Sequence, residues 1–321
     1  MNSRIFARAP GKLVLAGEYA VLLGAPSIVL AVDRYATCIY EATEDQGLRL
    51  KAVPLNEDVL VSSIQDLATK SDVSVVRLIS LFNEYLPKLS NAQICVDTTK
   101  FFQNGRKLGI GSSAASLVAT AKLVESLSGY RFEFEELLDL HRRFHGRGGS
   151  GLDVAAAQHG GVIEYRDKMT KPISLPANLQ LRFVYTGYET STDDMLARFR
   201  NWCTKSDKVL LDEWLKSSAL VADSLGNATK FIESVAVQSN LLQQIDRQAK
   251  LGIFGTVHQT AARIASQSDL LYKPSGAGGG DMGLVMGTDS NALDYFSQKI
   301  MESGLIEQSM TISRSGVEVV E

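Results

Sequence analysis

The residues best placed to do chemistry form a turn rich in glycine and serine. The run from Lys107 to Ser116 reads K-L-G-I-G-S-S-A-A-S, and apolar residues at helical spacing follow it as far as Gly129. A glycine loop that opens a helix lets an anion approach the backbone, where N–H groups and the positive end of the helix dipole attract it. The turn therefore predicts a phosphate-binding loop; the alternative is an ordinary turn in which a serine caps the helix.

A second glycine-rich stretch gathers positive charge. Residues 141–153 read H-R-R-F-H-G-R-G-G-S-G-L-D, so three arginines and two histidines precede a single aspartate, Asp153. Glycine leaves room for a ligand where these cations accumulate. The alternative is an exposed loop in which Asp153 caps a helix over residues 154–158.

Two further features join this set. Residues 275–281 read S-G-A-G-G-G-D and lead directly into an apolar run, which indicates another close approach of backbone to a ligand or to the first loop. Lys12 follows Pro10-Gly11, which fix the backbone just before it. A lysine in such a place is either a ligand-binding cation or an ordinary surface charge.

Several known nucleotide and hydrolase motifs do not match. No segment fits the P-loop pattern G-x-x-x-x-G-K-[ST], the hydrolase pattern G-x-S-x-G or the zinc pattern H-E-x-x-H. The dinucleotide pattern G-x-G-x-x-G lacks its third glycine after Gly109 and Gly111, and again after Gly276 and Gly278. What remains is phosphate binding by a glycine and serine loop, with separate lysine and carboxylate partners.

Periodicity predicts a mixed framework of helices and strands around these residues. Asn104-Gly105 is a strong hairpin signal, and Pro10-Gly11 is expected to end a first strand over residues 5–9 before Lys12. Helical spacing and short apolar runs predict the other elements. The predicted helices cover residues 73–89, 114–127, 134–144, 292–301 and much of 208–266, and the further strands cover residues 27–32, 94–96, 161–166, 181–185, 282–286 and 317–320.

Length and composition limit the classes of function. At 321 residues the chain is long for a single core, so two domains are expected, with a boundary near residue 166 that separates 1–166 from 167–321. The net charge of −3 provides no general attraction for nucleic acid or for an anionic membrane. An anionic substrate must therefore be held by local cations.

Cysteine usage and hydropathy indicate a cytoplasmic protein. Cys38, Cys95 and Cys203 are odd in number and far apart, which fits neither a disulfide framework nor a zinc site. Glu18 interrupts the first apolar run too early for a signal peptide, and no later segment reaches transmembrane length. We expect a soluble protein with no membrane partner.

Three motifs in order resemble those of the GHMP kinases, the family of galactokinase, homoserine kinase, mevalonate kinase and phosphomevalonate kinase. They are A-P-G-K at 9–12 with G-E at 17–18, G-I-G-S-S-A-A at 109–115, and S-G-A-G-G-G-D at 275–281. Residues 149–157, G-S-G-L-D-V-A-A-A, are most similar to the phosphomevalonate kinase branch. The resemblance implies an α+β fold with an N-terminal domain like domain 2 of ribosomal protein S5 and a ferredoxin-like C-terminal domain. Residues 41–90 and 200–270 carry no signal of the family.

The resemblance also implies ATP and Mg²⁺ as cofactors and gives roles to individual residues. Lys12 and Asp153 would lie at the centre of phosphoryl transfer, and the Ser113 hydroxyl would face magnesium. A helical glutamate that binds magnesium in mevalonate kinases would fall near His141 or Arg142, so that ligand is not carried over. The residues assigned to ATP are Lys107, Gly109, Ile110, Gly111, Ser112, Ser113 and Ala114. Those assigned to the acceptor are His145, Arg147, Ser150, Gly151, Ser191, Gly278, Gly279 and Asp281.

The acceptor is inferred from the group that attacks the γ-phosphorus. A neutral alcohol benefits from a base such as Asp153, whereas a phosphate, with a second pKa of about 6, is largely ionised at pH 7 and needs cations instead. The cations of residues 142–147 suit a phosphate if they face the cleft. The expected activity is phosphorylation of 5-phosphomevalonate to 5-diphosphomevalonate in isoprenoid precursor synthesis, by a monomer or homodimer. The alternatives are mevalonate kinase or another small-molecule kinase of the family, diphosphomevalonate decarboxylase, and a non-catalytic nucleotide-binding regulator.

Overall fold

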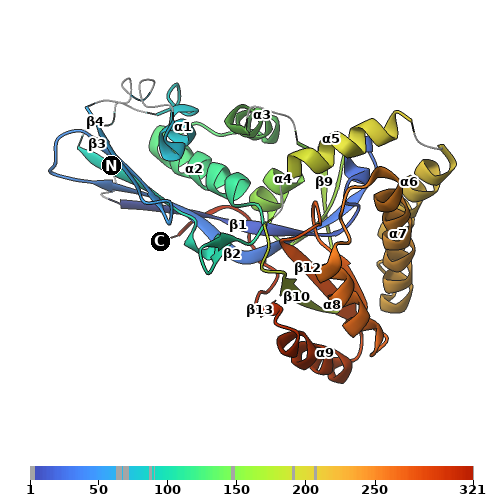
Figure 1. Cartoon of the computed structure of the whole chain (residues 1–321). Coiled ribbons are helices and arrows are strands. Elements are labelled where there is room, and N and C mark those ends of the chain that lie inside the picture. Colours follow the sequence, from blue (N-terminus) through green and yellow to red (C-terminus); the bar gives the residue numbers. More distant parts are fainter. Residues whose placement is uncertain are drawn as a thin grey trace.

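The computed structural model describes residues 4–62, 67, 72–86, 89, 91–145, 149–189, 192–205 and 208–320. The helices of the first half cover one face of a long sheet, and the last two helices lie beside a smaller sheet (Figure 1). This mixed arrangement confirms the predicted α+β class. Among the described helices, none combines the length and the apolar character needed to cross a bilayer.

The larger sheet is built mainly from antiparallel neighbours. Its order is β14-β1-β2-β5-β3-β4, and β8 pairs with both β2 and β9; β3 and β5 form a parallel pair. Alternate residues of β3 and β5 are buried, as expected for a sheet with one face against helices. The strands are β1 (Arg4–Ala16), β2 (Ser27–Ala42), β3 (Leu48–Val53), β4 (Glu57–Val61), β5 (Ala92–Asp97), β8 (Val162–Arg166), β9 (Met169–Ile173) and β14 (Glu318–Val320).

Strand β1 corrects one expectation. Pro10-Gly11 do not end the strand; it continues to Ala16, and the register with β2 shifts between these two residues. Strand β14 pairs only with residues 6–8, so the ladder on that side has ended before Pro10, and a bulge is a place where a sheet tolerates proline. Beyond the bulge the Lys12 N–H donates to the Ile110 carbonyl at 2.8 Å. At Lys12 the hydrogen-bonding neighbour of β1 on this side is therefore the glycine loop and no longer β14.

Four helices cover the larger sheet. Helix α2 begins after Gly111 and ends at Gly129, both in the left-handed conformation, which confirms the predicted helix and its C-cap glycine. Helix α1 is shorter than the predicted 73–89, because residues 81–86 leave it in turns whose N–H groups bond mostly three residues back. The helices are α1 (Ser74–Ser80), α2 (Ser112–Ser128), α3 (Phe134–His145) and α4 (Leu152–His159).

A tight hairpin leads into α2. Strands β6 (Phe102–Gln103) and β7 (Arg106–Lys107) pair through the two-residue turn Asn104-Gly105, whose φ angles are 51° and 76°. Positive φ at both positions is the type I′ geometry that this dipeptide favours. The predicted hairpin is confirmed, and it places Lys107 at the entrance to the glycine loop.

The smaller sheet has the order β11-β12-β10-β13, with all neighbours antiparallel. Helices α8 and α9 pack on it. The domain division at residue 166 stays a prediction; strands β9 and β14, which follow it in sequence, pair within the larger sheet. The elements are β10 (Gln180–Tyr185), β11 (Leu271–Pro274), β12 (Met282–Gly287), β13 (Ile306–Gln308), α5 (Thr192–Cys203), α6 (Lys208–Asp223), α7 (Ala228–Ala249), α8 (Thr256–Ser266) and α9 (Ser290–Glu302).

Gly160, which ends α4, is expected to be required for stability. Its φ of 71° and ψ of −171° fall in a region that is essentially limited to glycine, and a Cβ there would lie 2.2 Å from the Ser315 carbonyl carbon. We expect Gly160→Ala to lower the free energy of unfolding by about 3 kcal/mol, the upper end of the cost of one strained residue. Urea unfolding followed by circular dichroism measures this change.

Gly161 provides the matched control for this substitution. Its φ is 63°, yet nothing lies within 4 Å of a Cβ built there. Gly161→Ala should therefore lower the free energy of unfolding only by the cost of placing alanine in the left-handed conformation, about 1–2 kcal/mol. Equal losses for the two variants would contradict the collision with the segment at Ser315.

Candidate active site

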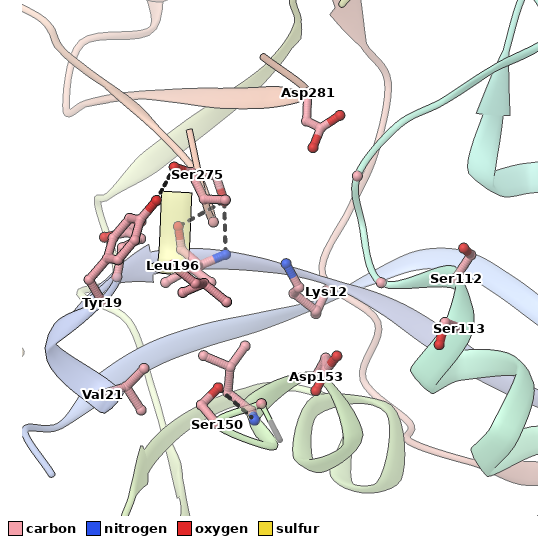
Figure 2. A pocket seen from close by; sticks show the side chains of 18 of the residues that line it. Lys12, Tyr19, Val21, Ser112, Ser113, Ser150, Asp153, Leu196, Ser275 and Asp281 are labelled. Carbon is pink, nitrogen blue, oxygen red and sulfur yellow. Dashed lines mark hydrogen bonds between the residues drawn. The ribbon is translucent and has the colours of Figure 1, made fainter. Parts of the chain in front are cut away.

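Most of the predicted site residues meet around one cavity of about 400 Å³. Figure 2 shows side chains from β1, from the start of α2, from the start of α4 and from the second glycine segment pointing toward a shared space. The predicted residues that line it are Lys12, Lys107, Gly109, Gly111, Ser112, Ser113, His145, Ser150, Asp153 and Asp281. Segments up to 269 positions apart in the chain, from Lys12 to Asp281, thus form one site.

The other predicted residues do not line this cavity. Ile110 and Ala114 are buried in the core behind the loop. Gly151 precedes α4, and Gly278 and Gly279 contact the segment at Ile253. Ligand contact by these residues stays a prediction. Two more, Arg147 and Ser191, lie outside the described residues.

Lys12 lies half-buried at the centre of the site, where it lines the cavity. Its ammonium group has carboxylate neighbours in Asp153, Asp281 and Glu18, which favour the charged form, but burial outweighs them and lowers the pKa of Lys12. The second glycine loop passes close to this ammonium group, because a Cβ added to Gly276 would lie 3.6 Å from Lys12 Nζ. The site therefore holds a desolvated cation between two cavity-lining carboxylates, Asp153 and Asp281 (Figure 2).

The first glycine loop presents the N-terminus of α2 to the cavity. Gly111 is the N-cap residue, with φ of 82°, and no side chain caps the helix. The alternative of a turn in which a serine caps the helix is therefore wrong, and the N–H groups of the first turn are left for another acceptor. Ser112 and Ser113 line the cavity at this point. This arrangement of backbone N–H groups and helix dipole is suited to an anion.

Gly109 is where the two glycine loops touch. A Cβ added to it would lie 2.4–2.5 Å from the Asp281 carboxyl group, and its φ is 72°. Only glycine allows the Asp281 side chain to pass this close to the first loop. The loops around 109 and 281 therefore form one wall of the cavity.

The second glycine loop is clamped to the end of β1. The Val14 N–H donates to Ser275 Oγ at 2.9 Å, and that hydroxyl donates to the Val14 carbonyl at 3.0 Å. Lys273 forms a buried ion pair with Glu18, and the Tyr19 hydroxyl donates to the Ala277 carbonyl at 2.7 Å. These contacts fix the distance between Lys12 and the second loop.

The Ser113 hydroxyl is surrounded by histidine. It lies 3.3 Å from His141 Nε2 and also contacts His145 Nε2, while His141 Nε2 lies 3.9 Å from Asp153 Oδ2. A serine hydrolase requires the two ring nitrogens of one histidine to contact serine and aspartate separately. Here His141 meets both through the same atom, so the cluster has no proton relay of that kind.

Arg142 and Arg143 contribute less to the cavity than expected. Arg143 is exposed, Arg142 is half-buried with no hydrogen-bond partner for its Nε within the described residues, and neither lines the cavity. Of that run as far as the structure describes it, His145 is the residue that reaches the cavity. The argument for a phosphate acceptor therefore loses the support of Arg142 and Arg143.

Sequence reasoning missed the apolar side of the site. Val14, Val21, Leu22 and Leu196 line the cavity opposite the charged groups. These residues belong to no motif, and ordinary core residues have the same types and spacing. They give this side of the cavity an apolar surface.

A second, smaller cavity of about 170 Å³ adjoins the first, and it was also missed. The two cavities share Lys107, Ser112, Ser113 and His145. The rest of its lining is largely apolar and comes in part from residues between 52 and 78, a stretch that carries no signal of the family. The apolar lining residues include Leu55, Val75, Leu78, Phe102 and Phe144.

His258 supports the second glycine loop from behind and gives a pH prediction. Its Nε2–H donates to the Gly280 carbonyl at 3.1 Å, so Nδ1 accepts from the Tyr272 hydroxyl at 2.9 Å. Burial lowers the pKa of His258 to about 4. Because the unfolded chain has a histidine pKa of about 6.5, it binds more protons than the folded chain between pH 6.5 and 4, and stability falls as the pH falls through that window.

This loss should amount to about 3 kcal/mol across the window. Urea unfolding at a series of pH values measures it. The variant His258→Gln cannot titrate and should show a flatter dependence of unfolding free energy on pH, even if its stability at pH 7 is lower. An unchanged slope in the variant would assign the acid sensitivity to other groups.

Known proteins resemble the chain in sequence and in structure. Residues 74–161 match the family described as GHMP kinases N terminal domain. The phosphomevalonate kinase of Streptomyces sp. strain CL190 is 26% identical, with 98% of each chain covered, and the mevalonate kinase of Pyrococcus horikoshii is 24% identical, with 100% of this chain and 99% of that protein covered. The structure of Streptococcus pneumoniae phosphomevalonate kinase in complex with phosphomevalonate and AMPPNP superposes with a TM-score of 0.79 at 18% identity, covering 96% of this chain and 99% of that one.

Proposed function

Because residues 74–161 are a GHMP kinase N-terminal domain and the chain has the GHMP kinase fold, we propose that it transfers the γ-phosphoryl group of ATP to 5-phosphomevalonate. The observation that carries the proposal is the half-buried Lys12 between Asp153 and Asp281, facing the uncapped N-terminus of α2. Phosphoryl transfer depends on positioning and charge neutralisation more than on covalent help from the protein. These residues supply both the positioning and the charge neutralisation.

We assign the ATP phosphates to the first glycine loop. The N–H groups of the first turn of α2 bind phosphate oxygens, and Lys107 at the mouth of the cavity adds a point charge. Lys12 neutralises the charge that develops on the transferred group. We place the nucleotide base in the adjoining cavity, whose apolar lining around Val75 and Leu78 suits a flat ring.

The residues beside Ser113 are compatible with a divalent ion. The Ser113 hydroxyl and the Asp153 carboxylate supply oxygen donors, which Mg²⁺ prefers. Within the described part of the chain, no group of three or more His, Cys, Asp or Glu side chains forms a complete metal site. The ion therefore depends on phosphate oxygens as well, and when bound it neutralises charge on the phosphates.

The choice of acceptor rests on relatives and on charge. The Streptomyces relative and the Streptococcus structure are both named phosphomevalonate kinase, and the latter was solved with phosphomevalonate. A phosphate nucleophile needs cations, and Lys12 and Lys107 face the cavity. The apolar wall suits the hydrocarbon part of the acceptor.

Mevalonate is the second candidate. It is favoured by the position of Arg142 and Arg143 outside the cavity and by Asp153, which is placed to accept a proton from a neutral alcohol. Curated relatives named mevalonate kinase have similar identities. The two acceptors thus differ in whether Asp153 must act as a base.

A coupled ADP-release assay with phosphomevalonate, mevalonate and several sugars tests the proposal. Turnover with phosphomevalonate in excess of mevalonate is the expected result, and turnover with mevalonate alone would replace the acceptor. Carbon dioxide release from diphosphomevalonate would identify a decarboxylase. ATP binding without turnover of any acceptor would identify a regulator that keeps the fold.

A further inference from the structure

The chain makes an unusual turn shortly after β1. Tyr19 has φ of 58° and ψ of −39°, and the Ala20 N–H donates to the Glu18 carbonyl at 2.6 Å. A hydrogen bond between residues two apart, around a central residue of positive φ and negative ψ, is typical of the classic γ-turn, which is rare and strained. A large side chain at such a position is a backbone outlier, and outliers of this kind are concentrated at functional sites.

The surroundings of Tyr19 explain how the strained turn persists. Before it, the Glu18 carboxylate is held by Lys273 in a buried ion pair. After it, the Leu22 N–H donates to the Tyr19 carbonyl at 2.9 Å within the 3₁₀-helix η1 (Ala20–Leu23). The Tyr19 side chain is itself buried. Contacts on both sides of the turn therefore hold a conformation that the residue would not adopt alone.

The Tyr19 side chain joins three walls of the cavity. Its ring packs against Phe199 of α5, with the ring centroids 5.0 Å apart, and its hydroxyl donates to the Ala277 carbonyl of the second glycine loop at 2.7 Å (Figure 2). Helix α5 contributes Leu196 to the apolar wall of the cavity, and η1, which begins directly after Tyr19, contributes two further residues of that wall. The spacing between the apolar wall and the second glycine loop is therefore set through one side chain.

The hydroxyl separates positioning from packing. Contact with Phe199 requires only the ring, which phenylalanine also has, whereas the bond to the Ala277 carbonyl requires the hydroxyl as donor. The residue before Ala277 is Gly276, where the loop passes close to Lys12 Nζ. The Tyr19 hydroxyl thus fixes the loop one residue away from the proposed centre of phosphoryl transfer.

We propose that Tyr19 is a positioning residue for the acceptor, and that the strained turn holds its hydroxyl against the second glycine loop. This inference rests on the proposed function, because it assigns the acceptor to the space between that loop and the apolar wall. The ATP phosphates are assigned to the start of α2, and Figure 2 shows Tyr19 and Ser113 on opposite sides of Lys12. Tyr19 therefore acts on binding of the acceptor and leaves binding of the nucleotide unchanged.

Tyr19→Phe tests this inference, because it keeps the ring and removes only the hydroxyl. Steady-state kinetics of the full chain with the best acceptor should show KM for the acceptor raised by about tenfold, the upper end of the usual effect of one hydrogen bond. The kcat value and KM for ATP should stay within about twofold, since a change confined to KM marks a loss of ground-state binding. Circular dichroism establishes that the variant is folded.

Tyr185→Phe is the matched control. The Tyr185 hydroxyl is buried and has no hydrogen-bond partner within the described residues, and Tyr185 does not line the cavity. This variant should leave both KM values unchanged. If Tyr19 served stability alone, Tyr19→Phe would lower the free energy of unfolding and leave KM for the acceptor unchanged.

That result would overturn the inference and leave the proposed function standing. An equal rise in KM for ATP and for the acceptor would also overturn it, because the hydroxyl would then support the whole cavity and not the acceptor side. Absence of turnover by the natural chain with any acceptor is a separate result, which would overturn the proposed function and this inference with it.

Discussion

Replacing Lys12 by methionine is expected to lower kcat by about 10³-fold, the upper end of the effect of removing one preorganised charge-stabilising group. Methionine keeps the length and apolar stem of lysine, so the half-buried side chain can still fill its space. It removes the only positive charge placed between the cavity-lining carboxylates of Asp153 and Asp281 among the described residues. ATP and the acceptor would then approach a site with uncompensated negative charge.

Steady-state kinetics with the best acceptor measures this loss. Lys122→Met is the matched control, because Lys122 lies on α2, pairs with Glu125 and is absent from the cavity lining. It should leave kcat within about twofold, as expected for a surface substitution of at most about 0.5 kcal/mol. If Lys12→Met keeps the activity of the natural chain, phosphoryl transfer does not occur in this cavity.

Replacing Asp153 by asparagine is expected to lower kcat by about 10²–10⁴-fold, the range attributed to general acid–base catalysis. The size of the loss should depend on the acceptor. A neutral alcohol needs the carboxylate to accept its proton, whereas a phosphate is already ionised, so the loss with phosphomevalonate should fall at the lower end. With phosphomevalonate, the loss of kcat that remains comes from the charge interaction of Asp153 with Lys12 and with the ion.

The informative measurement is the loss of kcat with mevalonate divided by the loss of kcat with phosphomevalonate. Asp139→Asn is the matched control, since Asp139 is an exposed residue of α3 that does not line the cavity. Circular dichroism establishes that the Asp153→Asn variant is folded. Full activity in that variant would contradict the role of Asp153 in the transfer step, whereas a non-catalytic nucleotide-binding regulator would bind ATP without turnover even in the natural chain.

The features that could be predicted from sequence are those set by neighbouring residues. Asn104-Gly105 imposes its own turn, and Gly111 and Gly129 define the ends of α2 through conformations that glycine adopts readily. The motif residues Lys12, Ser113 and Asp153 came together as the resemblance implied. In each case the residue type itself determines the local geometry.

The features that could not be predicted depend on distant partners. Strand β1 continues through Pro10-Gly11 because β2 and then the Ile110 carbonyl remain available to pair with it, which no local pattern reveals. Likewise, whether Arg142 and Arg143 face the cleft is decided by how α3 packs. The apolar wall around Leu22 and Leu196 has the composition of any core and becomes a binding surface only in the assembled structure.

The pairing of β14 with β1 has a consequence for how the protein is made. Arg8 and Glu318 are 310 positions apart, and they hydrogen-bond on the strand that carries Lys12. At about 5–20 residues per second, a ribosome needs roughly 15 to 60 s to make the intervening chain. During that time residues 6–8 of β1 have no β14 to pair with, and an unpaired strand edge of this kind can pair with another chain.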